Sequence, residues 1–239
     1  MPPDPIRIRA VPPWTPAHGA EAPFLPLSAE ERVELRRLGN AITFKTAGSQ
    51  IYEHNDEASF LYLLTDGVVE ADRTFPNGER QIVAFFWPGD VLGLAEEGVY
   101  VNSAAALTPC TVYRFPIDKL SKFLIEHPLL QLKFLVKSIN DLRNTQRQLL
   151  MMGRLNVLKR LAAFLLDCSA HETYFDAKRR VLTLPMTRYD VADYIGASAE
   201  GVIRGFGRLE ALGLLNRLSP RTLKLKTAEL KAFVDLADH

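Results

Sequence analysis

Cysteine is scarce in this sequence, with only Cys110 and Cys168 among 239 residues. These two thiols form no CxxC motif and cannot supply the four thiolates of an iron–sulfur cluster. Such usage fits the reducing cytoplasm, which is the location we expect. For Cys168, near the end of a predicted helix, we favour a small buried thiol, with a redox switch as the alternative.

Long apolar runs are also missing. No segment approaches the roughly 20 apolar residues that cross a membrane, so we expect no membrane partner. Residues 1–26 are rich in proline and lack the continuous apolar core of a signal peptide. We interpret them as an extended N-terminal arm that is ordered only where Trp14 or Phe24 finds a surface.

Clusters of catalytic residues are absent as well. The five histidines are scattered at positions 18, 54, 127, 171 and 239, and no His-x-His pair occurs. There is no nucleophile elbow, no glycine-rich phosphate loop and no pair of catalytic carboxylates. We therefore expect neither an enzyme nor a metal site. A cupin-like metal-binding enzyme is the alternative of a different class, and metal analysis of the purified protein would reveal it.

The net charge is only +1, but the charges are unevenly distributed. From Gly153 onward there are 14 Lys and Arg against 10 Asp and Glu, whereas the preceding residues contain 15 against 18. This mild basic excess in the C-terminal part suits a partner that carries phosphates. The hydrophobic fraction of 47% and charged fraction of 24% are ordinary for a soluble chain of one large or two modest domains.

Short, evenly spaced strands predict a β-roll within residues 27–118. A helix over Leu27–Leu38 opens this region, because Ser28 begins a capping-box sequence. Turn residues then separate eight β-rich segments, and Asn77-Gly78 marks the sharpest hairpin. The predicted strands are Ala41–Lys45, Gln50–Tyr52, Phe60–Thr65, Val68–Arg73, Arg80–Phe86, Val91–Leu94, Ser103–Ala106 and Thr111–Phe115.

A long helix is predicted within residues 119–152, because Pro128 suits a first turn and no breaker follows before Gly153. Its apolar positions alternate at intervals of three and four, which is the pattern of a coiled-coil seam. The seam consists of Leu132, Leu135, Ile139, Leu142, Gln146 and Leu149. It predicts a homodimer, with packing inside its own domain as the alternative. The residues expected to face the β-roll are Phe134, Val136 and Leu150.

The most informative segment is Thr187–Arg204, in a C-terminal domain that we place at residues 153–239. Ala192, Gly196 and Val202 have the spacing of a helix-turn-helix. The alanine lets two helices cross closely, the glycine takes the left-handed turn, and the valine faces the shared core. Ser198 is placed to cap the second helix with its hydroxyl.

Glu200 and Arg204 stand four residues apart on one exposed face of this second helix. In a major groove, glutamate accepts from cytosine N4, and arginine forks onto guanine O6 and N7. These positions indicate double-stranded DNA as the partner. An ordinary helical hairpin with a surface Glu–Arg pair is the alternative.

The rest of the C-terminal domain fits a winged helix-turn-helix, with a helix before it and a hairpin after it. The predicted elements are the helix Leu155–Ser169, the strand Val181–Leu184, the wing strands Leu215–Arg217 and Thr222–Lys226, and the helix Ala228–Ala237.

The order of β-roll, long helix and winged helix-turn-helix resembles the Crp–Fnr regulators over about Leu27–Phe233. The segment Leu184–Asp190 is most similar to the Fnr and FixK branches. Similar motifs in the roll and beyond are Gly48-x-x-Ile51-Tyr52-Glu53, Phe60-Leu61-Tyr62-Leu63-Leu64, Gly78-x-Arg80-Gln81-Ile82, Pro88-Gly89-Asp90-Val91-Leu92-Gly93 and Leu161-Ala162-Ala163-Phe164-Leu165. The resemblance implies an α+β fold, a cyclic-nucleotide-binding-like roll, a homodimer, transcriptional activation and RNA polymerase as a partner.

The same resemblance implies that Arg188 and Ser198 contact phosphates, while Glu200 and Arg204 read bases in a palindrome with TTG-like half-sites. Ile203 stands where Fnr-type readers usually carry serine, so it offers only apolar contact, as to a thymine methyl. The expected DNA-binding set is Arg188, Ser198, Ala199, Glu200, Gly201, Ile203, Arg204 and Arg208.

Two glycines are unusual in a recognition helix. Gly201 and Gly205 each cost about 1 kcal/mol relative to alanine in a helix interior. They predict a helix that is loose until DNA is present.

The effector pocket implied by the resemblance departs from that of cyclic-nucleotide binders. Its positions here are Gly93, Glu96, Glu97, Asn102 and Ser103. Asn102 stands where those proteins carry the arginine that neutralises the cyclic phosphate, and Glu96 and Glu97 would repel it. Cyclic AMP is therefore not expected to bind.

Two alternatives remain for the signal. One is a member that responds to haem or another small molecule: some relatives bind haem, and His54, His127 or Cys110 are the candidate ligands here. Other members, similar to FixK, use no ligand and are controlled by their own abundance. We predict no cofactor, and an absorption spectrum would test haem.

Overall fold

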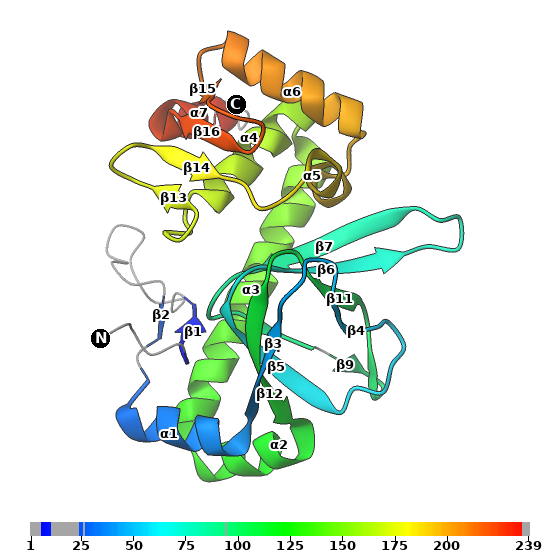
Figure 1. Cartoon of the computed structure of the whole chain (residues 1–239), viewed down its shortest axis with the longest axis vertical. Coiled ribbons are helices and arrows are strands. Elements are labelled where there is room, and N and C mark those ends of the chain that lie inside the picture. Colours follow the sequence, from blue (N-terminus) through cyan, green and yellow to red (C-terminus); the bar gives the residue numbers. More distant parts are fainter. Residues whose placement is uncertain (1–5, 11–23, 26, 94, 236–239) are drawn as a thin grey trace. The chain divides into compact units, whose positions relative to one another are not determined.

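The computed structural model describes residues 6–10, 24–25, 27–93 and 95–235 (Figure 1). The chain divides into two compact units. The first contains the residues up to Thr74 together with Val83–Thr145, and the second contains Phe75–Ile82 together with the residues from Gln146 onward. Both units combine helices and strands, which confirms the α+β fold class.

The first helix, α1 (Ala29–Leu38), begins as its sequence predicts. The Ser28 hydroxyl accepts a hydrogen bond from the Glu31 backbone N–H at 3.0 Å, and the Glu31 carboxylate accepts from the Ser28 backbone N–H. This reciprocal capping box satisfies two backbone N–H groups that the first turn of a helix leaves without partners. The helix ends before Gly39, at the start of the β-roll.

The β-roll consists of two four-stranded antiparallel sheets, in the orders β4-β11-β6-β7 and β3-β12-β5-β8. The strands of these sheets are β3 (Asn40–Phe44), β4 (Gln50–Tyr52), β5 (Phe60–Asp66), β6 (Val69–Thr74), β7 (Arg80–Phe86), β8 (Val91–Leu92), β11 (Ser103–Ala106) and β12 (Cys110–Pro116). All eight predicted strands are present, with ends that differ by one or two residues at most. The short pair β9 (Ala95–Glu96) and β10 (Val99–Tyr100) was missed, because two residues are too few to show alternation.

The N-terminal segment is ordered at Phe24, one of the two places expected in the predicted extended arm, and also at residues 6–10, which were not expected. The short strands β1 (Ile8–Arg9) and β2 (Phe24–Leu25) pair with each other, and Ile6 and Ile8 are completely buried. They belong to a hydrophobic cluster with Leu35, from α1. The alternation of isoleucine with arginine at positions 6–9 is a strand pattern that the proline-rich surroundings concealed. Trp14 lies outside the described residues.

Two helices follow the roll, where the sequence indicated one. The helix α2 (Ile117–Glu126) was missed, and α3 (Pro128–Arg154) begins at the expected proline. They are separated by His127, whose Nδ1 lies 2.8 Å from the Phe123 carbonyl oxygen. Because proline disfavours helical backbone in the residue before it, the break falls at this position.

One face of α3 packs against the first unit's own core. Val136 is buried in the cluster that contains Ile6 and Ile8, and Phe134 packs against its edge, as predicted. Lys137 is buried as well, and its Nζ lies 3.0 Å from Asp90 Oδ1 and also contacts Asp141. Leu150, by contrast, is 66% exposed, so the prediction that it faces the roll was wrong.

The second unit contains the predicted winged helix-turn-helix. Its helices are α4 (Val157–Cys168), α5 (Arg188–Ile195), α6 (Ala199–Ala211) and α7 (Thr227–Asp235). A four-stranded sheet in the order β13-β14-β16-β15 is built from β13 (Phe175–Asp176), β14 (Val181–Thr183), β15 (Leu215–Arg217) and β16 (Thr222–Leu225). Only β13, with two residues, was not predicted. No helix among the described residues is long and apolar enough to cross a membrane.

Candidate DNA-binding interface

The helix α5 begins with a second reciprocal capping box. The Asp190 backbone N–H donates to Thr187 Oγ1 at 3.2 Å, and the Thr187 backbone N–H donates to Asp190 Oδ2 at 2.7 Å. The Thr187 hydroxyl also donates to Asp190 Oδ2, at 2.7 Å. The start of α5 is therefore fixed by one buried carboxylate.

The turn between α5 and α6 has the predicted conformation. Gly196 adopts a left-handed backbone with φ of +64°, and its N–H donates to the Ala192 carbonyl. The Arg160 guanidinium, from α4, donates to the carbonyl oxygens of Ile195 at 2.7 Å and Gly196 at 3.2 Å. These bonds satisfy carbonyl groups that the end of a helix leaves without partners. The turn is therefore fixed by hydrogen bonds to both α4 and α5.

The second helix of the motif, α6, is capped and packed as predicted. The Ser198 hydroxyl accepts from the Gly201 N–H at 3.1 Å, and Val202 is completely buried. A Cβ added to Gly205 would lie only 2.9 Å from Leu161 Cδ2. Gly205 therefore allows α4 and α6 to approach closely, which the sequence did not reveal.

The opposite side of α6 carries the residues expected to read DNA. Glu200, Ile203, Arg204 and Arg208 are all exposed, and 53% of Ile203 is accessible to solvent. Among the described residues, the side chains of Glu200 and Arg204 take part in no hydrogen bond or ion pair, so they do not form the surface pair considered as an alternative. Their polar ends are therefore available for base edges.

Arg188 lies at a junction rather than on an open surface. Its Cζ lies 3.5 Å from the centroid of the Phe206 ring of α6, and its Nη2 donates to the Pro220 carbonyl oxygen in the wing at 2.8 Å. Burial, with smaller contributions from Arg217 and Arg221, lowers the pKa of this guanidinium to about 10. Arg188 therefore remains charged at neutral pH while it joins α5, α6 and the wing.

Two further arginines strengthen the wing. Arg217 donates through its backbone N–H and its Nε to the Glu210 carboxylate, at 2.9 and 2.7 Å. Arg221 Nη1 donates to the Pro185 carbonyl oxygen at 3.2 Å. Together with Arg188 they place three positive charges around the wing turn. Arg217 and Arg221 were not predicted as site residues, because their grouping depends on hairpin geometry.

The seam residues of α3 share an outward orientation. Leu132, Leu135, Leu142 and Leu149 are 48, 54, 58 and 72% exposed. Ile139 is half-buried and Gln146 is exposed. A row of exposed leucines along one helix is unusual for a surface that remains in water.

The interior of the roll is filled with tyrosines. The ring centroids of Tyr52 and Tyr100 lie 4.0 Å apart, and those of Tyr52 and Tyr62 lie 5.5 Å apart. All three side chains are buried, and the Tyr100 hydroxyl donates to the Phe60 carbonyl at 2.8 Å. Burial raises the pKa of Tyr52 and Tyr62 well above the ordinary value, so these phenols stay neutral.

The predicted effector residues lie between the end of β8 and the start of β11. Gly93 is buried in a left-handed conformation, where an added Cβ would lie 3.0 Å from the Phe60 carbonyl oxygen. Ser103 Oγ accepts from the His54 backbone N–H at 3.1 Å, and Asn102 is half-buried. Glu97 is exposed in the turn between β9 and β10, and Glu96 is the last residue of β9.

The candidate haem ligands are dispersed. His127 stacks on Phe123 and pairs with Glu34, with 3.2 Å between Nε2 and the carboxylate. Cys110 is buried in the roll cluster. Within the described ranges, no three His, Cys, Asp or Glu side chains are grouped so that they could hold a metal ion.

Comparison with known proteins agrees with this architecture. Residues 43–127 match the cyclic nucleotide-binding domain family, and residues 159–233 match the Crp-like helix-turn-helix domain family. The nitrogen fixation regulation protein FixK of Bradyrhizobium diazoefficiens is 32% identical over 189 residues, covering 79% of each chain. The transcriptional activatory protein AadR of Rhodopseudomonas palustris is 29% identical over 184 residues, covering 77% of each chain.

Solved structures show the same arrangement of elements. FixK2 from Bradyrhizobium japonicum is similar with a TM-score of 0.74 and 27% identity, over 81% of this chain and 96% of that chain. A CooA mutant from Carboxydothermus hydrogenoformans shares the fold, with a TM-score of 0.72 and 19% identity over 87% and 92% of the two chains. The capped helix-turn-helix, the β-roll and these relatives lead to one conclusion: the chain belongs to the Crp–Fnr family of DNA-binding transcriptional regulators and is not an enzyme.

Proposed function

We propose that the protein is a homodimeric transcriptional activator that recognises a palindromic DNA site with α6. The observation that carries the proposal is the exposed face of α6, where Glu200 and Arg204 have no partner among the described residues. The N-terminal residues of a recognition helix are those that reach base edges in the major groove. Relatives named for transcriptional activation and nitrogen fixation regulation support the activator role, which brings RNA polymerase as a further partner.

Each half-site is read by direct contacts and held by phosphate contacts. Arg204 donates to a guanine and Glu200 accepts from a cytosine, which favours one conserved G·C pair in a TTG-like element. Ile203 offers a thymine methyl an apolar surface. The remaining residues of the interface position the helix on the sugar–phosphate backbone; they are Arg188, Ser198, Ala199, Gly201 and Arg208.

Dimerisation through the α3 seam supplies the symmetry that a palindrome requires. The exposed leucines at positions 132, 135, 142 and 149 are spaced for a partner helix, and Gln146 is a polar position that fixes register. Two recognition helices related by a twofold axis then contact half-sites about 34 Å apart.

The roll acts without a cyclic nucleotide. Its interior is occupied by Tyr52, Tyr62 and Tyr100, and Asn102 offers no positive charge to a phosphate. We expect the purified protein to be colourless, and we propose that it is controlled by its own abundance. Calorimetric titration with cyclic AMP or cyclic GMP gives no saturable heat, and micromolar binding of either nucleotide would contradict this part of the proposal.

Selection from a randomised duplex library tests the DNA specificity. The purified protein enriches palindromes whose half-sites are one helical turn apart, and anisotropy titrations at fixed salt then compare the enriched duplex with a scrambled one. Specific protein–DNA complexes are typically at least about a thousandfold tighter than non-specific ones. Equal affinity for the two duplexes would overturn the proposed function.

A further inference from the structure

A short hairpin from the middle of the sequence belongs to the same compact unit as the helix-turn-helix. Residues Phe75–Ile82 contain the Asn77-Gly78 turn, in which Gly78 has φ of +83°. Its N–H donates to the Phe75 carbonyl at 2.9 Å, and the Phe75 N–H donates to the Glu79 carbonyl at 2.8 Å. These bonds give the turn a defined conformation. Arg80, two residues after Gly78, is the first residue of β7.

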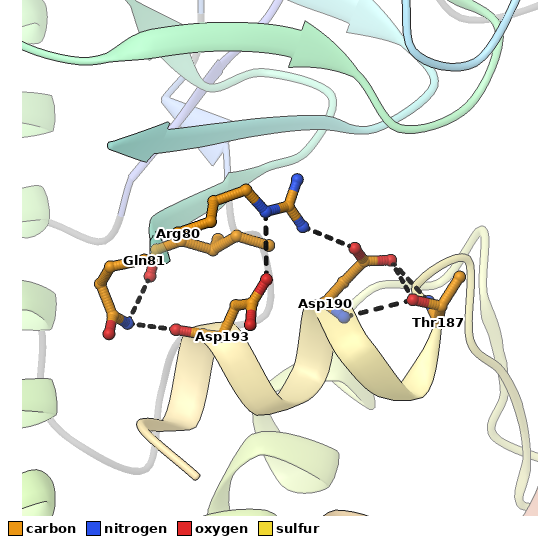
Figure 2. Close-up of polar contacts among 6 residues, drawn as sticks. Arg80, Gln81, Thr187, Asp190 and Asp193 are labelled. Carbon is orange, nitrogen blue, oxygen red and sulfur yellow. Dashed lines mark hydrogen bonds and ion pairs between the residues drawn. The ribbon is translucent and has the colours of Figure 1, made fainter. Parts of the chain in front are cut away.

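Arg80 divides its guanidinium between two carboxylates of α5 (Figure 2). Nη2 lies 2.8 Å from Asp190 Oδ1, and Nε lies 3.0 Å from Asp193 Oδ2. The two aspartates are three residues apart and so face the same side of the helix. The neighbouring Gln81 amide donates to the backbone carbonyl of Asp193. Two consecutive side chains of the hairpin thus bind one face of α5.

The Asp190 carboxylate connects this contact to the start of the DNA-binding motif. Its Oδ1 binds Arg80, while its Oδ2 accepts both the N–H and the hydroxyl of Thr187. Only 12% of the Asp190 side chain is exposed, so its interactions with Arg80 and Thr187 are shielded from water. The residue after Thr187 is Arg188, whose side chain stacks on Phe206 of α6.

We propose that Arg80 is a positioning residue for DNA binding, acting through Asp190 and Asp193 on the first turns of α5. This inference rests on the proposed function, because it assumes that the motif binds DNA. Arg80 keeps the Asp190 carboxylate in the orientation that caps α5, and the capped turn presents Arg188 between α6 and the wing.

Partly exposed ion pairs often stabilise a protein without any effect on its function, so the test must separate affinity from stability. Arg80→Ala is compared with Arg80→Lys, Asp193→Ala and the double variant of Arg80→Ala with Asp193→Ala. The matched control is Glu79→Gln, in the same turn, because the Glu79 side chain bonds only to Asn77 in the described structure. Affinity for the selected palindrome is measured by anisotropy, well below the melting temperature of every variant, with the active fraction determined by stoichiometric titration.

We expect Arg80→Ala to weaken DNA binding about tenfold, the scale of one or two charge-assisted hydrogen bonds. Arg80→Lys restores part of the loss, since one ammonium reaches one carboxylate at a time. The double variant is no weaker than Arg80→Ala alone, because both changes remove the same interaction. Hydrogen exchange of the backbone amides at 188–191 becomes faster in Arg80→Ala, while the control matches the wild type.

Three results would overturn the inference. One is an Arg80→Ala variant that melts at a lower temperature but binds the palindrome within twofold of the wild type. Another is tighter binding of the palindrome by Arg80→Ala, which would mean that Arg80 inhibits DNA binding. A third is a double variant whose loss of DNA affinity is the product of the losses caused by Arg80→Ala and Asp193→Ala alone. A wild-type protein without preference for any palindrome would instead refute the proposed function, so the two failures are distinguishable.

Discussion

Arg188 and Phe206 join the two helices of the DNA-binding motif, with 3.5 Å between the guanidinium carbon and the ring centroid. The same guanidinium reaches the wing through the Pro220 carbonyl. A planar cation on an aromatic face keeps its charge while its nitrogen atoms stay available at the edge. One side chain therefore joins α5, α6 and the wing and still carries a positive charge.

Replacing Arg188 is expected to weaken binding to all DNA sequences alike. Arg188→Ala should also reduce the slope of log K against log salt by about two, because the homodimer loses one phosphate contact in each half-site. Arg188→Lys keeps the charge but loses the planar stacking, so it should fall between alanine and the wild type. Arg179→Ala, at a side chain that is 83% exposed, is the control. A loss confined to the palindrome would show that Arg188 reads bases.

Replacing Arg204 is expected to act on sequence specificity. Arg204→Ala should cost about 1–3 kcal/mol per half-site on the selected palindrome, because one bidentate contact to guanine is removed. Binding to scrambled DNA should barely change. Anisotropy titrations on both duplexes check this, and equal weakening on both would place Arg204 at the backbone instead.

Charges in the α3 seam are expected to separate the dimer. Leu135→Asp together with Leu142→Asp should give monomers in sedimentation experiments and abolish operator binding, since a carboxylate cannot be buried without a partner. Asn144→Asp, at an exposed position on the opposite side of the same helix, is the matched control and should remain dimeric. Dimers that persist in the double variant would show that another surface holds the two chains.

Two glycines of α6 provide a matched pair of substitutions that are expected to change protein stability in opposite directions. Gly207→Ala should raise the free energy of unfolding by about 0.5–1 kcal/mol, because the added Cβ would meet no atom within 4 Å apart from its chain neighbours and the backbone of α6 itself. Gly205→Ala should lower it by about 1 kcal/mol, since its Cβ would overlap the fully buried Leu161. Urea denaturation compares the two. A stabilising Gly205→Ala would mean that Leu161 can move aside.

Both thiols are expected to be inert in the folded protein. Burial raises the pKa of the Cys110 thiol to about 11 and that of Cys168 well above its ordinary value. At pH 8 only about one Cys110 thiol in a thousand is ionised, so iodoacetamide should label neither residue until a denaturant is added. Mass spectrometry of intact protein measures this. Rapid labelling of native Cys168 would support the redox switch.

Local signals made much of the DNA-binding motif predictable. The hydroxyl of Ser198 predicts a helix cap, and the backbone freedom of Gly196 predicts a turn. The spacing of Val202 from these residues predicts that it faces the core. These features depend on residues within one or two turns of each other. The predicted strands likewise follow from alternation and turn residues close by.

Contacts between segments that are far apart in the sequence could not be predicted from it. Arg80 and Asp190 are 110 positions apart, and nothing in either neighbourhood marks them as partners. The stacking of Arg188 on Phe206 and the close approach of Gly205 to Leu161 depend on how helices cross. The burial of Ile6 and Ile8 was hidden for a similar reason, because their partners come from α1, α2 and α3.

The tyrosines packed inside the roll have a consequence for how quickly such a regulator responds. On the proposed function, the roll has no step in which a ligand arrives or leaves. On the proposed function, the response time of the genes it controls is then set by synthesis and turnover of the protein.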